Sequence, residues 1–446
     1  MTDYKFSTQI KRLSIALIII GAIGIAFGFY SAPSNVEEAK EILASMSHGD
    51  SHEGDSHEGD SHSVEDHGDK SEVGHEYDHD KHVFNQLHNK PWAAIYVPAL
   101  FFMMISLGVL AFYAIQRASQ AGWSIVLFRI MEGITSYLLP GCIFVIIILV
   151  FSALNFNHLF IWMDPEVVAH DEIIRNKVGY LNTPFFFARA IVYITGWVLY
   201  RNISRKLSLE QDNNNDISIH KKLFRFSAGF LVFFLISESM MSWDWIMSID
   251  PHWFSTLFGW YVFAGMFVSG ITTIALITIY LKSQNYLSFV NNSHIHDLGK
   301  FMFGVSVFWA YLWFSQFMLI WYSNIPEEVT YFTARLEVDN YRFLFWFSMI
   351  INFVVPVVLL MSRDAKRHNG TLIIVSIIIL IGHWINSYLL VAPGTLNTHG
   401  HIGFTEIGMG LGYFGLFMYV VLNALTKAPL EVKNHPMLEE SKHLHT

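Results

Sequence analysis

The sequence is poor in cysteine and in charged residues. Its single cysteine, Cys142, lies inside an apolar run, which predicts that it is a small, buried, apolar side chain. One cysteine excludes an intrachain disulfide, iron–sulfur ligation by four cysteines and a Cys-x-x-Cys-His haem attachment. Charged residues make up only 15% of the chain, against roughly 25% in soluble proteins. If the chain belongs to an electron-transfer system, partner subunits must carry most of the redox centres.

Hydrophobic residues, in contrast, make up 53% of the 446 residues and recur in runs of about 20. Backbone polar groups in lipid must be satisfied within their own segment, so such runs predict helices. The sequence therefore predicts an all-α integral membrane protein with ten transmembrane helices. The predicted spans are 13–31, 92–116, 124–153, 184–201, 223–245, 254–282, 299–323, 341–362, 371–392 and 404–425.

The first span and the loop charges set the predicted topology. Residues 1–31 are interpreted as a retained anchor rather than a cleaved signal peptide, because the apolar stretch is longer than a usual signal core. With the N-terminus inside, the inner segments hold 18 of the 28 Lys and Arg residues. The positive-inside rule then predicts a multi-pass membrane protein with both termini cytoplasmic.

Residues 32–91 differ in composition from the rest of the chain. They hold 15 acidic residues, four lysines and nine histidines, and they include a short Ser-His-Glu-Gly-Asp repeat. A histidine-rich tract is able to bind Zn, Cu or Ni loosely. We favour the simpler interpretation, an acidic, flexible periplasmic loop that cannot bury enough apolar surface to fold alone.

Ionisable residues inside predicted spans are candidates for function, because burying them in lipid is costly. Arg129 and Glu132 share one face of the third span, and they are either a self-neutralising structural pair or part of a proton-accessible half-channel. Arg189, near the outer end of the fourth span, is expected to pair with Asp164 or Asp171 of the preceding loop or to reach the interface.

Glu238 and His383 lie deep in predicted spans. No oppositely charged residue is near Glu238 in sequence, which favours a proton-handling role over a hydrogen-bonded neutral carboxyl. His383 is the only histidine deep in a span, so a bis-histidine haem is excluded and a core role competes with a proton-relay or quinone-contact role.

Three segments carry a resemblance to a known family. They are SWDWIMSIDPHWFSTLFGWYVFAG at 242–265, YLWFSQFMLIWYSNIPEE at 311–328 and IGHWINSYLLVAP at 381–393. Together they resemble the second NrfD-like membrane subunit of bacterial alternative complex III, a quinol:electron-acceptor oxidoreductase. The resemblance runs from about residue 92 to 425 and leaves out the histidine-rich loop. It implies a location in the bacterial inner membrane.

The resemblance implies two up-and-down four-helix bundles, at 92–245 and 246–392, with the first helix and residues 393–446 peripheral. It implies a non-catalytic subunit that conducts or couples protons and binds no metal. Haem c and iron–sulfur clusters would sit in partners: a sister NrfD-like quinol-binding subunit, an iron–sulfur subunit, c-type cytochromes and, as a further candidate, a terminal oxidase.

Nine residues are candidates for a proton path. Those carried over from the family motifs are Asp244, Asp250, His252, Gln316 and His383; those inferred from burial are Arg129, Glu132, Arg189 and Glu238. Alternative interpretations are a menaquinone or ubiquinone site near Asp250 and His252, a secondary transporter and an inert scaffold.

Overall fold

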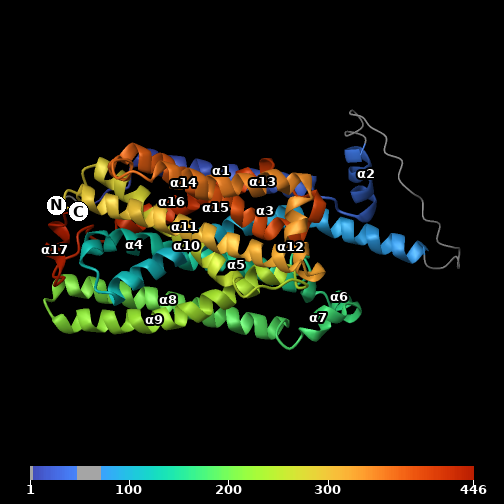
Figure 1. Ribbon diagram of the computed structural model, residues 1–446, viewed down its shortest axis with the longest axis horizontal. Helices are drawn as coiled ribbons and strands as arrows, with labels where there is room; N and C mark the ends of the chain where they lie inside the picture. Colours follow the sequence, from blue (N-terminus) through green and yellow to red (C-terminus); the bar gives the residue numbers. More distant parts are fainter. Residues whose placement is uncertain (1–3, 48–71, 446) are drawn as a thin grey trace.

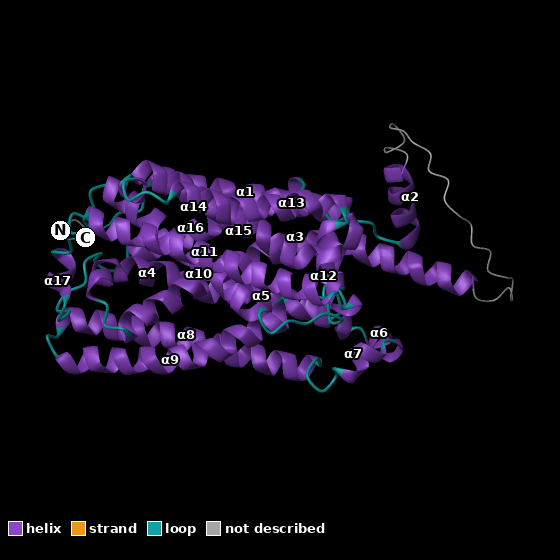
Figure 2. Cartoon of the chain, viewed as in Figure 1, coloured by secondary structure: helices purple, strands orange, loops and turns teal. Residues whose placement is uncertain are grey.

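The computed structural model of the chain describes residues 4–47 and 72–445. Within these residues the chain is helical and has no strand (Figure 2). Ten of the helical segments are long and apolar enough to cross a membrane, which agrees with the number predicted from hydropathy. The protein therefore has the architecture of a multi-pass, all-α membrane protein.

The spanning segments run nearly parallel to the long axis of the molecule (Figure 1). Single helices form most of them: α1 (Thr8–Ser31), α3 (Glu72–Ala118), α8 (Thr183–Asn213), α9 (Ile217–Trp245), α10 (Phe258–Ser283), α11 (Asn292–Ser323), α15 (Asn369–Leu396) and α16 (Phe404–Leu425). The other helices are short: α2 (Val36–Ser47), α6 (Pro165–His170), α7 (Glu172–Asn176), α12 (Pro326–Leu336) and α17 (Leu438–Lys442).

Two spans are broken near a proline. The third span consists of α4 (Phe128–Ile134) and α5 (Leu138–Ala153), joined by a tight turn at Thr135–Tyr137 just before Pro140. The eighth consists of α13 (Asp339–Met349) and α14 (Val355–Leu359), joined by a wide π turn at Ile350–Val354 just before Pro356. Proline has no backbone N–H and crowds the preceding turn, so the helix changes its winding there.

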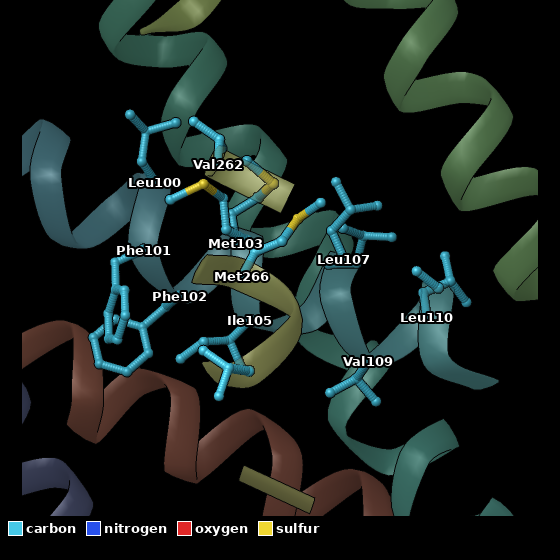
Figure 3. Close-up of a cluster of buried hydrophobic side chains, with 14 of the residues drawn as sticks. Leu100, Phe101, Phe102, Met103, Ile105, Leu107, Val109, Leu110, Val262 and Met266 are labelled. Atoms are coloured by element: carbon cyan, nitrogen blue, oxygen red, sulfur yellow. The ribbon is translucent and has the colours of Figure 1, made fainter. Parts of the chain in front are cut away.

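Helices α3 and α10 form the centre of the molecule. They are the most buried of the ten spans and pack against each other, and α3 also contacts α5, α9, α15 and α16. Figure 3 shows α3 side chains such as Leu100 and Met103 gathered beside Val262 and Met266 of α10. The spanning stretches of both helices are largely apolar around their whole circumference, as expected for helices surrounded by other helices.

The chain termini lie at one end of the molecule (Figure 1), which we call the terminal face, with α17 and the turn at 214–216. We call the other end the opposite face; it holds α6, α7, α12 and residues 250–257. An even number of spans requires this arrangement, since each span reverses the direction of the chain.

Residues 32–91, predicted as a flexible loop, are helical over part of their length. Helix α3 begins at Glu72, well before its apolar stretch, and α2 packs on it through Ala39, Val83 and Leu87. This small apolar contact gives the polar part of α3 a surface to pack on. The Ser-His-Glu-Gly-Asp repeat lies outside the described residues.

Candidate functional site

Arg129 and Glu132 belong to a buried network of five charged side chains near the terminal face. Arg129 Nη1 donates to Glu132 Oε2 at 2.7 Å, as the shared helix face predicted, and Arg129 also pairs with Asp212 of α8. Arg205 of α8 pairs with Glu132 as well. Arg117 of α3, whose Nη2 is 3.9 Å from Glu132 Oε1, is the third arginine. Three arginines and two carboxylates therefore share one site, which joins α3, α4 and α8.

Hydrogen bonds complete this network. Arg117 Nε donates to Tyr113 Oη at 3.0 Å, and Tyr113 Oη donates to Glu132 Oε1 at 3.0 Å. Ser208 accepts from both Arg117 and Arg129. Two guanidinium groups and a phenol contact the carboxylate oxygens of Glu132. These contacts favour a structural role, as part of a buried ion pair, for Glu132.

The C-terminal tail closes this network from the terminal face. Asp212 accepts from the backbone N–H of Lys433, and Asn434 donates to the Asp212 carbonyl. His435 is buried with its ring edge against Phe128, and Ser441 donates to the Trp123 carbonyl. The tail therefore covers this network instead of extending into solvent.

Arg189 and Asp244 form a second buried ion pair, near the opposite face. Arg189 donates from Nε and Nη2 to the two Asp244 oxygens, each at 2.8 Å, and Tyr193 Oη donates to the same carboxylate at 2.9 Å. The predicted pairing of Arg189 with Asp164 or Asp171 is therefore wrong. Those two carboxylates cap α6 and α7 by accepting from Glu166 and Ile174 backbone N–H groups.

Asp250 and His252 lie at the surface of the opposite face. His252 Nε2 is 2.5 Å from Asp171 Oδ2, and its Nδ1 is 4.0 Å from Asp250 Oδ1. Partial burial disfavours the charged form of Asp171, but the Ile174 N–H and His252 outweigh this and lower the pKa of the Asp171 carboxyl.

Glu238 lies apart from the other candidates. It is 2% exposed, and within the described chain its Oε2 accepts a long hydrogen bond of 3.5 Å from Ser239 Oγ, while Oε1 has no partner. The nearby Ser242, on the same face, donates instead to the Ser239 carbonyl. Glu238 is thus a buried carboxyl without a counter-charge among the described residues.

His383 has no hydrogen-bond partner on either ring nitrogen within the described residues. It is 2% exposed, and its ring meets the Trp309 ring edge-to-face with centroids 5.2 Å apart. The space beside it exists because Gly265 of α10 has no side chain: a Cβ there would be 3.5 Å from His383 Nδ1.

Three small cavities lie among α3, α10, α11, α12, α13 and α15. The outer cavity, about 40 Å³, is lined by Asp250, Trp253, Tyr331, Arg335 and Gly394 among others. The middle cavity, about 20 Å³, shares Tyr331 and Arg335 with it and adds Tyr261, Gln316 and Asn386. The inner cavity, about 20 Å³, shares Asn386 with the middle one and adds Ser269, His383 and Ser387.

These cavities bring Asp250, Gln316 and His383 into one series of adjoining spaces, each large enough for ordered water. The other six candidates lie elsewhere: Arg129 and Glu132 in the network at the terminal face, Arg189 and Asp244 in their own pair, His252 at the surface and Glu238 alone. Reasoning from the sequence missed Arg335, Arg117, Arg205 and Asp212, because they lie outside both the predicted spans and the family motifs.

Ten apolar helices and buried ionisable side chains together define a multi-pass membrane protein with polar groups in its interior. Comparison with protein-family models finds no match for the chain, and comparison with curated proteins finds none either.

Proposed function

We propose that this chain is a proton-conducting or proton-coupling membrane subunit of a quinol-oxidising respiratory complex of the alternative complex III type. One observation above all supports the proton role. Two titratable side chains, Glu238 and His383, lie inside spanning helices and have no ion-pair partner in the described chain. Carboxyl and imidazole groups exchange protons readily, and unpaired ones inside a membrane are functional candidates.

The cavity series supports one half of such a path. Water in the outer, middle and inner cavities would link Asp250 at the opposite face to His383 within the membrane. Gln316 and Asn386, which line the middle cavity, would hold that water by hydrogen bonds. We propose that protons enter or leave by this route.

The membership of the complex rests on the resemblance of residues 242–265, 311–328 and 381–393 to the NrfD-like family. The implied pair of four-helix bundles is compatible with the helix contacts, since α3, α5, α8 and α9 contact one another in series, as do α10, α11, α14 and α15. Partner subunits would then carry haem c and iron–sulfur clusters, and the quinol would be oxidised on the sister subunit.

Gentle solubilisation of native membranes and isolation of the tagged chain test this membership. We expect an iron–sulfur subunit, a second NrfD-like protein and a c-type haem signal in the reduced-minus-oxidised spectrum. A chain that purifies alone and without haem would contradict the proposal and favour a secondary transporter.

Proton movement in vesicles containing the purified complex tests the role of the two side chains. We expect Glu238→Gln and His383→Gln to lower proton translocation by about tenfold or more while quinol oxidation falls much less, since each removes a proton carrier. Glu210→Gln, the same chemical change at an exposed site of α8, is the matched control. Unchanged proton movement in both core variants would refute the path.

A further inference from the structure

Arg335 of α12 is a buried arginine that pairs with no carboxylate in the described chain. It is 5% exposed, its Nε donates to the Leu389 carbonyl at 3.1 Å, and its Nη1 donates to the Tyr331 carbonyl at 2.6 Å. Its guanidinium also lies over the Tyr331 ring, 3.5 Å from the centroid. These contacts with neutral groups fix the side chain in place without giving its charge a direct ion pair.

A buried charge of this kind is costly unless another charge balances it. The other buried arginines follow this rule, because Arg129 contacts Glu132 and Asp212, and Arg189 contacts Asp244. Arg335 differs from them in lining two cavities, the outer and the middle one. Space for a counter-ion is therefore available beside its guanidinium.

The middle cavity has the lining expected of an anion site. None of its lining residues is acidic, and Arg335 is its only charged residue. Gln316, 4% exposed, also lines it and makes no hydrogen bond within the described chain, so its amide N–H groups are free to donate into the cavity.

Two further polar side chains in this lining have their acceptor atoms occupied. Asn386 Oδ1 accepts from Tyr261 Oη at 2.5 Å, which leaves the Asn386 amide N–H groups as donors. Ser348 Oγ accepts from Asn352 Nδ2 at 3.1 Å, which leaves the Ser348 hydroxyl proton to donate. Hydrogen-bond donors without a partner in the described chain surround the Arg335 guanidinium, and no carboxylate lines the middle cavity. This arrangement favours a negatively charged ligand.

The size of the cavity limits that ligand. A volume of about 20 Å³ is close to that needed for one water molecule, and a halide ion is only slightly larger. We propose that Arg335, Gln316, Ser348 and Asn386 bind a small monovalent anion in the middle cavity. An anion bound there displaces the water of the proposed proton path, so the two occupants of the middle cavity exclude each other. The test of the anion site uses no proton measurement.

The proposal is tested by the excess line width of the ³⁵Cl NMR signal as chloride is titrated onto the purified chain in detergent. We expect saturable broadening with the wild-type chain and a dissociation constant raised about tenfold or more in Arg335→Gln, because a hydrogen-bonded charge is lost. Arg342→Gln is the matched control, since Arg342 is an exposed arginine that pairs with Asp339 on α13. It should leave chloride binding unchanged.

Two further variants keep the test decisive if Arg335→Gln does not fold. Gln316→Leu breaks no hydrogen bond within the described chain and should still weaken chloride binding severalfold. Asp250→Asn removes a carboxylate from the neighbouring outer cavity and should tighten chloride binding. Absence of saturable broadening in the wild type, or equal binding by the wild type and Gln316→Leu, would overturn the proposal.

Discussion

Glu132 illustrates how a residue's neighbours decide its role. From the sequence, a structural ion pair and a proton carrier were both open, because Arg129 was the only partner in view. The fold adds Arg117, Arg205 and Tyr113 around the same carboxylate, from α3 and α8. Removing this carboxylate leaves three arginines with Asp212 as the remaining carboxylate of the network.

We therefore expect Glu132→Ala to lower the free energy of unfolding by about 3–5 kcal/mol, the usual cost of breaking a buried ion pair. Thermal unfolding of the purified variant in detergent, followed by tryptophan fluorescence, measures this loss. Glu210→Ala on the exposed side of α8 serves as the control. If Glu132→Ala unfolds like the wild type but stops proton movement, the structural role is wrong.

Arg189 is a second residue whose role depends on its neighbours, and its partner was predicted wrongly from the sequence. Candidate partners were sought in the loop just before it in sequence, although Asp244 was itself a candidate. Helices α8 and α9 are antiparallel across the short turn at 214–216, so the start of α8 lies beside the end of α9. Two residues 55 positions apart therefore form the pair. The antiparallel order of two consecutive spans would have been enough to predict that Arg189 and Asp244 lie near each other.

Among the elements, the C-terminal tail carries a pH-sensitive contact. His435 is neutral in its docked position, because burial, and next the nearby Arg117 charge, lower the pKa of its imidazole to about 3. In an undocked tail the same imidazole has its ordinary pKa of about 6.5. The undocked state therefore binds more protons between these values, so docking weakens as the pH falls below 6.5.

We expect hydrogen exchange of residues 430–445 to change little between pH 7.5 and 6.5 after correction for the intrinsic rate. The docking free energy should then fall by about 1 kcal/mol, or roughly fivefold in opening, between pH 6.5 and 5.5, and by about 1.4 kcal/mol per pH unit just below that range. His435→Asn should remove this dependence, and the exposed His443→Asn should retain it. A pH response that survives His435→Asn would assign the switch to another group.

The packing of α1 against α16 depends on glycine at the helix crossing. A Cβ at Gly412 would lie 2.7 Å from Gly21 Cα, which is too close for any side chain, whereas a Cβ at Gly304 of α11 would meet open space. Small residues let two helix backbones approach closely in a membrane. This pair of positions gives a direct comparison between a packed and an unpacked glycine.

We expect Gly412→Ala to destabilise the docking of α1 by about 1–3 kcal/mol, as for other overpacked contacts. Gly304→Ala should be neutral or slightly stabilising, because alanine favours a helix more than glycine does. Hydrogen exchange along residues 8–31 reports the docking of α1. Equal exchange in the two variants would show that the close contact is unimportant for α1.

The topology of the whole molecule can be tested by labelling introduced cysteines, because the chain has a single cysteine of its own. Cys142 is fully buried, so the wild-type chain should react slowly with a membrane-impermeant maleimide. Exposed Asn214 lies in the α8–α9 turn at the terminal face, and exposed Asn176 ends α7 at the opposite face (Figure 1).

We expect Asn214→Cys and Asn176→Cys to be labelled from opposite sides of the membrane, with Asn214→Cys reacting from the cytoplasm. Intact cells and inverted vesicles provide the two sides. Labelling of both variants from one side would contradict the ten-span topology, and reversed labelling would contradict the predicted orientation.

The sequence by itself determined the class of the fold. Long apolar runs dictate membrane helices because lipid offers no hydrogen-bond partner to a backbone, and all ten predicted spans overlap segments of the structure that are long and apolar enough to cross a membrane. It also pointed to the Arg129–Glu132 pair, since residues three apart share a helix face.

Only the tertiary structure decided which distant side chains meet. The Arg189–Asp244 pair, the tail over Asp212 and the cavities beside Arg335 join residues from different helices, and such contacts depend on helix rotation and crossing. Hydropathy does not fix either of these, because one apolar face fits lipid as well as it fits a neighbouring helix.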